Sequence, residues 1–109
     1  MSMSADVDAP AVDLDLLKVV AEPLRWHILE LLADEELCVC HLVDELGVNQ
    51  PLVSHHLRVL REAGLVTSSR FRYWTYYRLV PGALASLAGS LSRLASSDLV
   101  EGERRRPCC

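Results

Sequence analysis

Four cysteines are the side chains in this sequence best suited to chemistry, and they stand in two pairs, Cys38 with Cys40 and Cys108 with Cys109. Thiolate is the soft ligand among protein side chains, and it selects ions such as copper(I), zinc and their heavier relatives. Cys38 and Cys40 stand where a helix is expected to begin, and the dipole and free N–H groups of a helix start lower the pKa of a thiol. The internal pair is therefore a candidate site for a soft metal ion.

Other roles remain open for these thiols. Two neighbouring thiols can act as a redox switch, although a Cys-x-Cys loop is strained relative to relaxed disulfide geometry. A free cysteine also packs well as a small buried residue, and the terminal pair could be idle. Positions i and i+2 point apart on a regular helix, by about 200°, so Cys38 and Cys40 converge only if the chain at Cys38 is extended or the first turn opens.

The composition indicates one soluble domain. The chain has 109 residues, of which 50% are hydrophobic, enough for one core but small enough to gain from dimerisation. The N-terminal stretch lacks the apolar run of a signal peptide, and no apolar stretch approaches the ~20 residues of a membrane span. We therefore expect a cytoplasmic protein with no membrane partner, in which free thiols serve as metal ligands or redox groups.

Charge is distributed unevenly, although the net charge is only −4. Residues 1–49 carry eleven acidic side chains against Lys18 and Arg25, whereas residues 50–79 carry five arginines against Glu62. A basic surface on an acidic body is typical of a protein that meets a polyanion through one face. The alternative is a charged face that is merely solvated.

The middle of the chain has the pattern of a helix-turn-helix. A short helix is predicted over residues 40–46, with Gly47 as a left-handed stop. Asn49 can cap the next helix, which carries Pro51 in its first turn and ends at Gly64. Only Gly-Val-Asn separates the two helices, which predicts a tight turn between them.

A hairpin and a terminal helix follow. Residues 66–70 and 73–79 are rich in β-branched and aromatic residues and predict two strands with their tip near Phe71-Arg72. Neither tip residue is suited to positive φ, so we expect the tip to be longer or mobile. A helix over about residues 82–96 has a leucine seam that favours a partner helix, or alternatively packs on its own domain; the seam consists of Leu84, Leu87, Leu91 and Leu94.

These elements predict the fold class, mainly α with a β-hairpin (α+β) in a winged helix-turn-helix. Two more helices precede the motif, one capped by Asp13 and one that starts at Pro23 and runs to about residue 33. The domain spans residues 13–96. Residues 1–12 are expected to be a disordered arm, and residues 97–109 a flexible tail that ends in Cys108 and Cys109.

The second helix of the motif is expected to face double-stranded DNA. If its apolar residues point inward, the polar side chains that point outward can bond base edges or phosphates; they are Gln50, Ser54, His55, Arg58 and Arg61. Arg70 and Arg72 flank the wing tip, where contacts to the minor groove and to phosphates are natural. The alternative is a scaffold for protein interaction. No catalytic motif is evident, so we do not expect an enzyme.

Two histidines next to these motifs differ in their expected roles. His56 stands beside the inward-facing Leu57 and is expected to be a structural histidine with satisfied hydrogen bonds. His41 directly follows Cys40, so it is a possible additional metal ligand.

Three stretches together resemble the ArsR/SmtB family of metal-responsive bacterial repressors: ELCVCHL, LGVNQPLVSHHLRVLREAGLV and RFRYWTYYRL. The resemblance covers roughly residues 13–96, and ELCVC is similar to the arsenic-responsive and the cadmium- and lead-responsive branches. It implies a homodimer, formed through the N- and C-terminal helices, that sits on a palindromic operator and leaves it when a metal or metalloid binds.

The resemblance also bears on the inducer. The third cysteine that the arsenic branch often has is replaced by Val43, and the last helix lacks the Asp-x-His pair of the zinc branch. Cys38, Cys40 and one tail thiol would give the three sulfurs that trivalent arsenic or antimony prefers, whereas all four cysteines would suit cadmium, lead or zinc. We expect arsenic or antimony, with those metals or a thiol-redox signal as alternatives. One ion that grips both sulfurs would distort the start of the helix-turn-helix and release the DNA.

Overall fold

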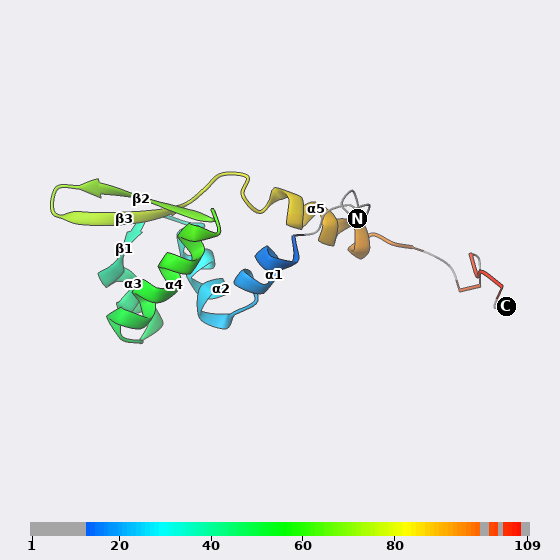
Figure 1. The fold of residues 1–109 in the computed structure, drawn as a ribbon, viewed down its shortest axis with the longest axis horizontal. Coiled ribbons are helices and arrows are strands. Elements are labelled where there is room, and N and C mark those ends of the chain that lie inside the picture. The colour runs from blue at the N-terminus through cyan, green and yellow to red at the C-terminus, as the bar shows by residue number, and fades with distance from the viewer. Residues whose placement is uncertain (1–12, 99–100, 103, 108–109) are drawn as a thin grey trace, which may run out of the picture.

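Five helices and a small sheet make up the computed structural model, which describes residues 13–98, 101–102 and 104–107. In chain order they are α1 (Leu14–Val20), α2 (Pro23–Leu32), β1 (Leu37–Cys38), α3 (Val39–Leu46), α4 (Gln50–Glu62), β2 (Val66–Phe71), β3 (Trp74–Leu79) and α5 (Ala85–Ala95) (Figure 1). The expected arm, residues 1–12, and the two terminal cysteines lie outside the described residues. Within the described part of the chain, no helix has the length and apolar character needed to cross a bilayer.

Helices α1, α2 and α4 begin where the sequence predicts, whereas α3 begins at Val39, one residue before the predicted start. The carboxylate of Asp13 and the amide oxygen of Asn49 each accept the backbone N–H three residues further on, at 3.0 Å. Glu22 caps α2 in the same way at 2.8 Å, and Pro23 follows it in the first turn. Each such cap stabilises a helix by about 0.5–2 kcal/mol, so local sequence alone fixes these starting points.

The helix-turn-helix is formed by α3 and α4. Residues 47–49 separate the two helices, as predicted. Gly47 has φ 69° and donates its N–H to the carbonyl of Val43 at 2.9 Å, which is the left-handed stop that glycine adopts without strain. The apolar face of α4 points inward and contributes Val53, Leu57 and Leu60 to the core.

The β2–β3 hairpin is tighter than the sequence predicts. Phe71 pairs with Trp74, so only Arg72 and Tyr73 form the turn, and the expectation of a longer tip is wrong. Each strand boundary at the tip is displaced by one residue from the predicted one, because cross-strand pairing continues through Phe71 and Trp74.

The sequence did not predict β1. This strand has two residues, which is too short for a periodic pattern. It pairs antiparallel with β3, with Leu37 opposite Tyr77 and Cys38 opposite Tyr76, so the sheet order is β1-β3-β2. The wing strand β3 is therefore hydrogen-bonded on its second edge to the segment that leads into α3.

The core lies where α2, α3 and α4 meet the start of β2. Its fully buried side chains are Ile28, Leu42, Val53, Leu57, Leu60 and Leu65. Loss of a buried leucine side chain costs about 2–5 kcal/mol. The core therefore fixes which face of α4 is buried and which is exposed.

The last helix starts later than predicted. Pro81 and Gly82 form a turn in which Gly82 has φ 77°, and α5 begins only at Ala85. Of the leucine seam, Leu87 is buried, whereas Leu91 is 51% and Leu94 71% exposed. In Figure 1, α5 lies on the side of the molecule away from the hairpin tip.

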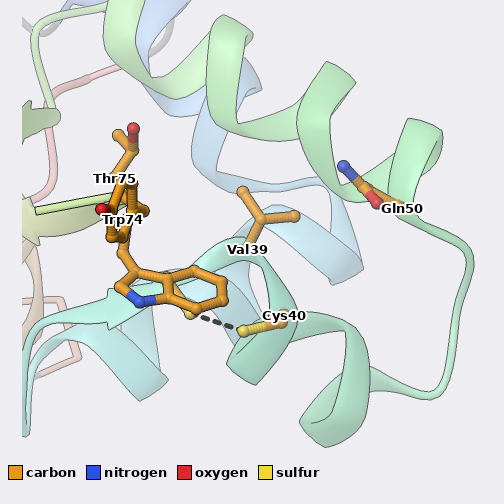
Figure 2. Close-up of a pocket in the computed structure, with 7 residues that line it drawn as sticks. Val39, Cys40, Gln50, Trp74 and Thr75 are labelled. Carbon is orange, nitrogen blue, oxygen red and sulfur yellow. Dashed lines mark hydrogen bonds between the residues drawn. The ribbon is translucent and has the colours of Figure 1, made fainter. Parts of the chain in front are cut away.

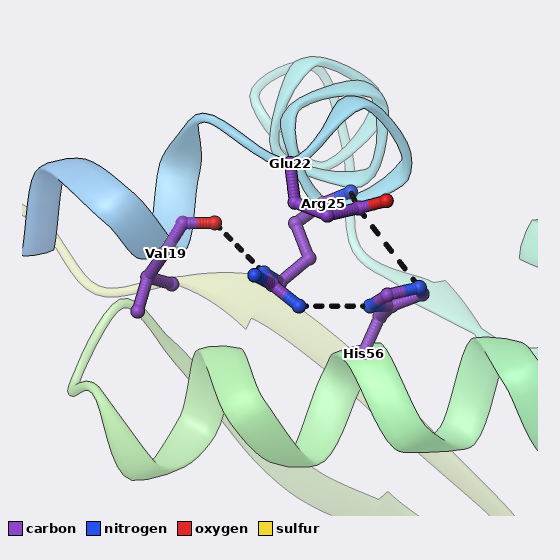
Figure 3. A network of polar contacts seen from close by, with 4 residues as sticks. All are labelled: Val19, Glu22, Arg25 and His56. Carbon is purple, nitrogen blue, oxygen red and sulfur yellow. Dashed lines mark hydrogen bonds and ion pairs between the residues drawn. The ribbon is translucent and has the colours of Figure 1, made fainter.

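A partly buried polar network connects α1, α2 and α4 (Figure 3). Arg25 donates from Nε to the carbonyl of Val19 at 2.7 Å and from Nη1 to Nδ1 of His56 at 3.1 Å. His56 Nε2 lies 3.9 Å from the Glu22 carboxylate. Because Nδ1 accepts a hydrogen bond from a cation, the imidazole is neutral with its proton on Nε2. His56 is thus a buried structural histidine, as predicted.

This network makes stability depend on pH. Burial lowers the pKa of His56, and Arg25 and His55 lower it further against the opposing effect of Glu22. The unfolded chain, with an ordinary histidine pKa of about 6.5, therefore binds more protons on acidification than the folded chain. We expect the free energy of unfolding to fall as the pH falls from about 7.5 to about 5.5.

Urea unfolding at several pH values tests this prediction with two variants. His56→Gln keeps a hydrogen-bond acceptor for Arg25 but cannot titrate, so its stability should depend less on pH than that of the wild type. His27→Gln, at an exposed position of α2, is the matched control and should keep the wild-type dependence. Equal slopes for His56→Gln and the wild type would contradict the assignment.

Candidate functional site

The two internal cysteines converge at the start of α3. Cys38 is the last residue of β1 and the N-cap of α3, with an extended backbone at φ −91° and ψ 171°. Cys40 lies in the first turn of the helix, and the two Sγ atoms are 2.7 Å apart. Both thiols are free. The extended chain at Cys38 is what brings together two side chains that would point apart on a regular helix.

His41 joins the sulfur pair. Its Nδ1 accepts the backbone N–H of Cys38 at 3.2 Å and lies 3.3 Å from the Cys38 Sγ. Ligand atoms of Cys38, Cys40 and His41 all lie within 4.8 Å of one another. From the sequence, His41 was predicted only as a possible additional ligand. Its place three residues after the N-cap is the signal that could have found it, since a side chain there can reach back to the N-cap backbone.

The two thiols differ in acidity. Burial raises the pKa of Cys38, but hydrogen bonds from the Cys40 thiol and from the backbone at the start of α3 outweigh it, and the pKa is lowered overall. The same thiol–thiol hydrogen bond raises the pKa of Cys40, since deprotonation would break it and bring two charges together. Cys38 is therefore the first of the two thiols to lose its proton. The resulting thiolate binds metal ions more strongly than the thiol does.

This donor set fits a soft ion. Two sulfurs and one imidazole nitrogen suit zinc, cadmium and related thiophilic ions, and both thiols are free to bind. Loss of the Cys40 proton on binding would make the affinity rise with pH. Cys108 and Cys109, the other predicted ligands, lie outside the described residues.

A cavity of about 250 Å³ opens over the sulfur pair. Figure 2 shows the Trp74 indole beside the dashed line between the two sulfurs, which ends at Cys40, with Gln50 further along the cavity. Its walls come from three parts of the fold, the β1–α3 junction, the first residue of α4 and the start of β3; they are Cys38, Val39, Cys40, Gln50, Tyr73, Trp74 and Thr75. A ligand bound at the sulfurs would therefore lie against both α4 and the wing.

A second hollow, of about 520 Å³, lies on the other side of His41. Carboxylates dominate its lining, together with Leu31, Leu37, His41 and Tyr76; the acidic residues are Asp34, Glu35, Glu36, Asp44 and Glu45. Fields from clustered charges of one sign concentrate ions of the opposite sign nearby. This surface favours the approach of cations to the imidazole side of the sulfur cluster.

The outer face of α4 is polar and free of contacts with the core. The five residues predicted to face DNA from this helix are all exposed; they are Gln50, Ser54, His55, Arg58 and Arg61. The opposite face buries Val53, His56, Leu57 and Leu60. The arginine and amide side chains can therefore reach an external partner without disturbing the core.

The wing tip carries the other two predicted contacts. Arg70 and Arg72 are exposed, and Arg70 Nε donates to the Arg72 carbonyl at 3.4 Å. The Arg72 guanidinium lies 5.3 Å from the centre of the Phe71 ring. Arg72 has φ 58°, so the tip does contain a left-handed residue, contrary to the expectation from its residue types. A two-residue turn that follows the twist of the strands needs positive φ, which explains the conformation.

Comparison with known proteins places the chain in a family. The family model described as "Bacterial regulatory protein, arsR family" matches residues 22–68. A solved structure described as "Possible transcriptional regulator for arsenical resistance" aligns with a TM-score of 0.66 and 38% sequence identity, over 74% of this chain and 84% of that chain. This chain belongs to the arsR family.

Two curated relatives are named as repressors. The arsenical resistance operon repressor of Escherichia coli is 42% identical over 69 residues, which is 62% of this chain and 59% of that protein. The HTH-type transcriptional repressor SmtB of Mycobacterium tuberculosis is 40% identical over 86 residues, which is 79% of this chain and 64% of that protein. The chain thus spans less than two thirds of the length of these two relatives.

Membership of the arsR family confirms the main predictions about class. The fold is a winged helix-turn-helix, with mainly α structure and a β-hairpin, as predicted. The family is one of DNA-binding transcriptional regulators rather than of enzymes.

The left-handed residue of the wing provides a testable consequence. A non-glycine residue at positive φ is strained by about 1–2 kcal/mol. A glycine there relieves the strain, but part of this gain is lost because glycine has more conformational freedom in the unfolded chain. We expect Arg72→Gly to be more stable than Arg72→Ala by about 0.5–1 kcal/mol in urea unfolding. Equal stability of the two variants would contradict the left-handed conformation.

Proposed function

We propose that this protein is a homodimeric, cytoplasmic transcriptional repressor that binds a palindromic operator and is released when a thiophilic ion binds Cys38 and Cys40. The observation that carries this proposal is the convergence of two free thiols, 2.7 Å apart, at the first residues of the helix-turn-helix. A ligand there would touch the start of α3, and it would also lie against the first residue of α4 and the wing.

The DNA-binding half of the proposal is supported by the exposed face of α4. Arginine can make two hydrogen bonds to guanine and glutamine two to adenine in the major groove, which suits Arg58, Arg61 and Gln50. Ser54 and His55 would add contacts to bases or phosphates, and Arg70 and Arg72 would reach the minor groove or the phosphates beside it.

The dimer is supported by apolar side chains that face solvent in the single chain. Leu14 of α1 and Leu91 and Leu94 of α5 are large, apolar and more than half exposed. Complete burial of a fully exposed leucine contributes about 1.5–3 kcal/mol, so burial of the exposed part of each of these side chains contributes about half of that or slightly more. Two copies joined through α1 and α5 would present two α4 helices to half-sites about one helical turn apart.

For the inducer, trivalent arsenic or antimony is the first candidate. The Cys38–Cys40 pair supplies two of the three sulfurs that these ions prefer, and Cys108 or Cys109 of either subunit would supply the third. Relatives named as arsenical resistance repressors, such as that of Escherichia coli, support the same choice.

A divalent ion, cadmium, lead or zinc, is the second candidate. Two features favour it: His41 belongs to the ligand cluster, and the adjoining hollow is lined by five carboxylates. A cation would be attracted by these carboxylates, whereas arsenous acid is uncharged at neutral pH and would not be.

Operator binding, followed by fluorescence anisotropy under reducing conditions, tests the proposal. Arsenite, antimonite, cadmium, lead and zinc are each titrated into the protein–DNA complex. We expect release by at least one of them, with arsenite or antimonite acting at the lowest concentration. Release by cadmium alone would replace the first candidate by the second, and release by a disulfide-forming oxidant alone would indicate a redox regulator. Retention of DNA under all these conditions would refute the proposal.

A further inference from the structure

The cavity over the thiols is bounded by both elements that face DNA. Gln50, the first residue of α4, and Trp74, the first residue of β3, line it together with Cys38 and Cys40. In Figure 2 the indole of Trp74 stands beside the sulfur pair. A bound ion with its remaining ligands would occupy this space of about 250 Å³ and contact the indole.

Trp74 is also joined to the wing tip. It pairs with Phe71 across the two-residue turn that carries Arg72. Any displacement of the Trp74 backbone is therefore passed to both residues of the turn and to the guanidinium above the Phe71 ring.

The sulfur site and the wing share a sheet as well. Cys38 pairs with Tyr76 of β3, and Trp74 lies two residues before Tyr76. Residues i and i+2 of a strand point to the same face. Trp74 and Tyr76 therefore lie on one face of β3. The strand that carries Cys38 is hydrogen-bonded to β3, and β3 extends directly from the sulfur site to the wing tip.

We propose that Trp74 is the positioning residue through which an occupied sulfur site moves the wing and so releases DNA. The inference rests on the proposed function and assigns its coupling to a wing residue, in addition to any distortion of α3. An ion can shift the equilibrium between two wing positions only by the difference in its affinity for them. Contact with the indole would supply that difference, because Trp74 lines the cavity and is also the first residue of the wing strand β3.

Fluorescence gives the first test. In a Trp26→Phe background, Trp74 is the sole tryptophan, and arsenite or cadmium is added without DNA. We expect the emission of Trp74 to change and to saturate at the same concentration as the ultraviolet absorption of the ion–thiolate bond. An unchanged emission, while that absorption reports binding, would refute the inference.

Operator release gives the second test. The quantity measured is the ratio of operator affinity without ion to that with saturating ion, which equals the coupling between the two ligands. Typical couplings in proteins are about 5–150-fold. We expect the ratio to fall below about 3-fold in Trp74→Ala. In Trp74→Phe it should lie between that value and the wild-type ratio, because the phenyl ring is smaller than the indole. Trp26→Phe, at a similarly exposed tryptophan (51% against 53%) that does not line the cavity, should keep the wild-type ratio.

The outcomes separate this inference from the proposed function. A wild-type protein that holds its operator in the presence of every ion refutes both. A wild-type protein that is released, together with a Trp74→Ala variant released to the same extent, refutes the inference alone. If circular dichroism finds Trp74→Ala unfolded, Trp74→Phe and the fluorescence test decide the question.

Discussion

Replacement of Cys38 by serine should abolish release of the operator by ions while leaving the protein bound to DNA. Cys38 is the thiol with the lowered pKa, it is held 2.7 Å from Cys40, and its Sγ lies 3.3 Å from His41 Nδ1. Even loss of a supporting hydrogen bond costs a metal site about 10–100-fold in affinity. Loss of the central sulfur should therefore weaken ion binding by more than about 100-fold. Anisotropy with operator DNA and absorption of the ion–thiolate bond measure both effects.

Variants at the other ligands make this test sharper. Cys40→Ser should be similarly defective, because it removes the second sulfur. His41→Gln should impair the response to cadmium or zinc more than the response to arsenite, since imidazole is a natural ligand of these two metals. The double variant Cys108→Ser with Cys109→Ser shows whether the tail thiols take part. A Cys38→Ser protein that is still released at wild-type concentrations of ion would place the sensor elsewhere in the chain.

Arg58→Ala should weaken operator binding by about 10–100-fold, without any change in ion binding. Arg58 lies on the exposed face of α4, opposite the buried Val53, Leu57 and Leu60, so the substitution leaves the core intact. In a dimer the contact is lost twice. Anisotropy at several salt concentrations measures the affinity and its dependence on salt.

Two matched controls distinguish the role of Arg58. Arg58→Lys keeps the charge but loses the paired hydrogen bonds to guanine, so it should restore non-specific binding but not specificity. Arg106→Ala removes the same charge from an exposed position beyond α5 and should leave operator affinity nearly unchanged. If Arg58→Ala only reduces the salt dependence, by about one phosphate contact, Arg58 binds the backbone of DNA. Wild-type affinity of Arg58→Ala would remove the exposed face of α4 from the interface.

The sequence by itself determined the elements whose signals are local. Asp13, Glu22 and Asn49 accept backbone N–H groups only three residues away, and Gly47 ends α3 through its own φ. The inward face of α4 follows from the spacing of its apolar residues along one helix. These interactions join residues within one or two helical turns, so the local sequence is enough to predict them. The helix-turn-helix, its exposed arginines and the family resemblance follow from the same local patterns.

Only the tertiary structure decided how the sulfur site is arranged. Cys38 is extended because β1 pairs with β3, whose Tyr76 stands far along the chain, and a two-residue strand has no periodicity to reveal it. The same pairing brings Trp74 to the thiols and leaves His41 within 3.3 Å of one sulfur. The left-handed Arg72 likewise follows from the twist of paired strands and not from its residue type. Contacts between distant segments depend on the whole fold, because each requires a backbone conformation that a remote partner stabilises.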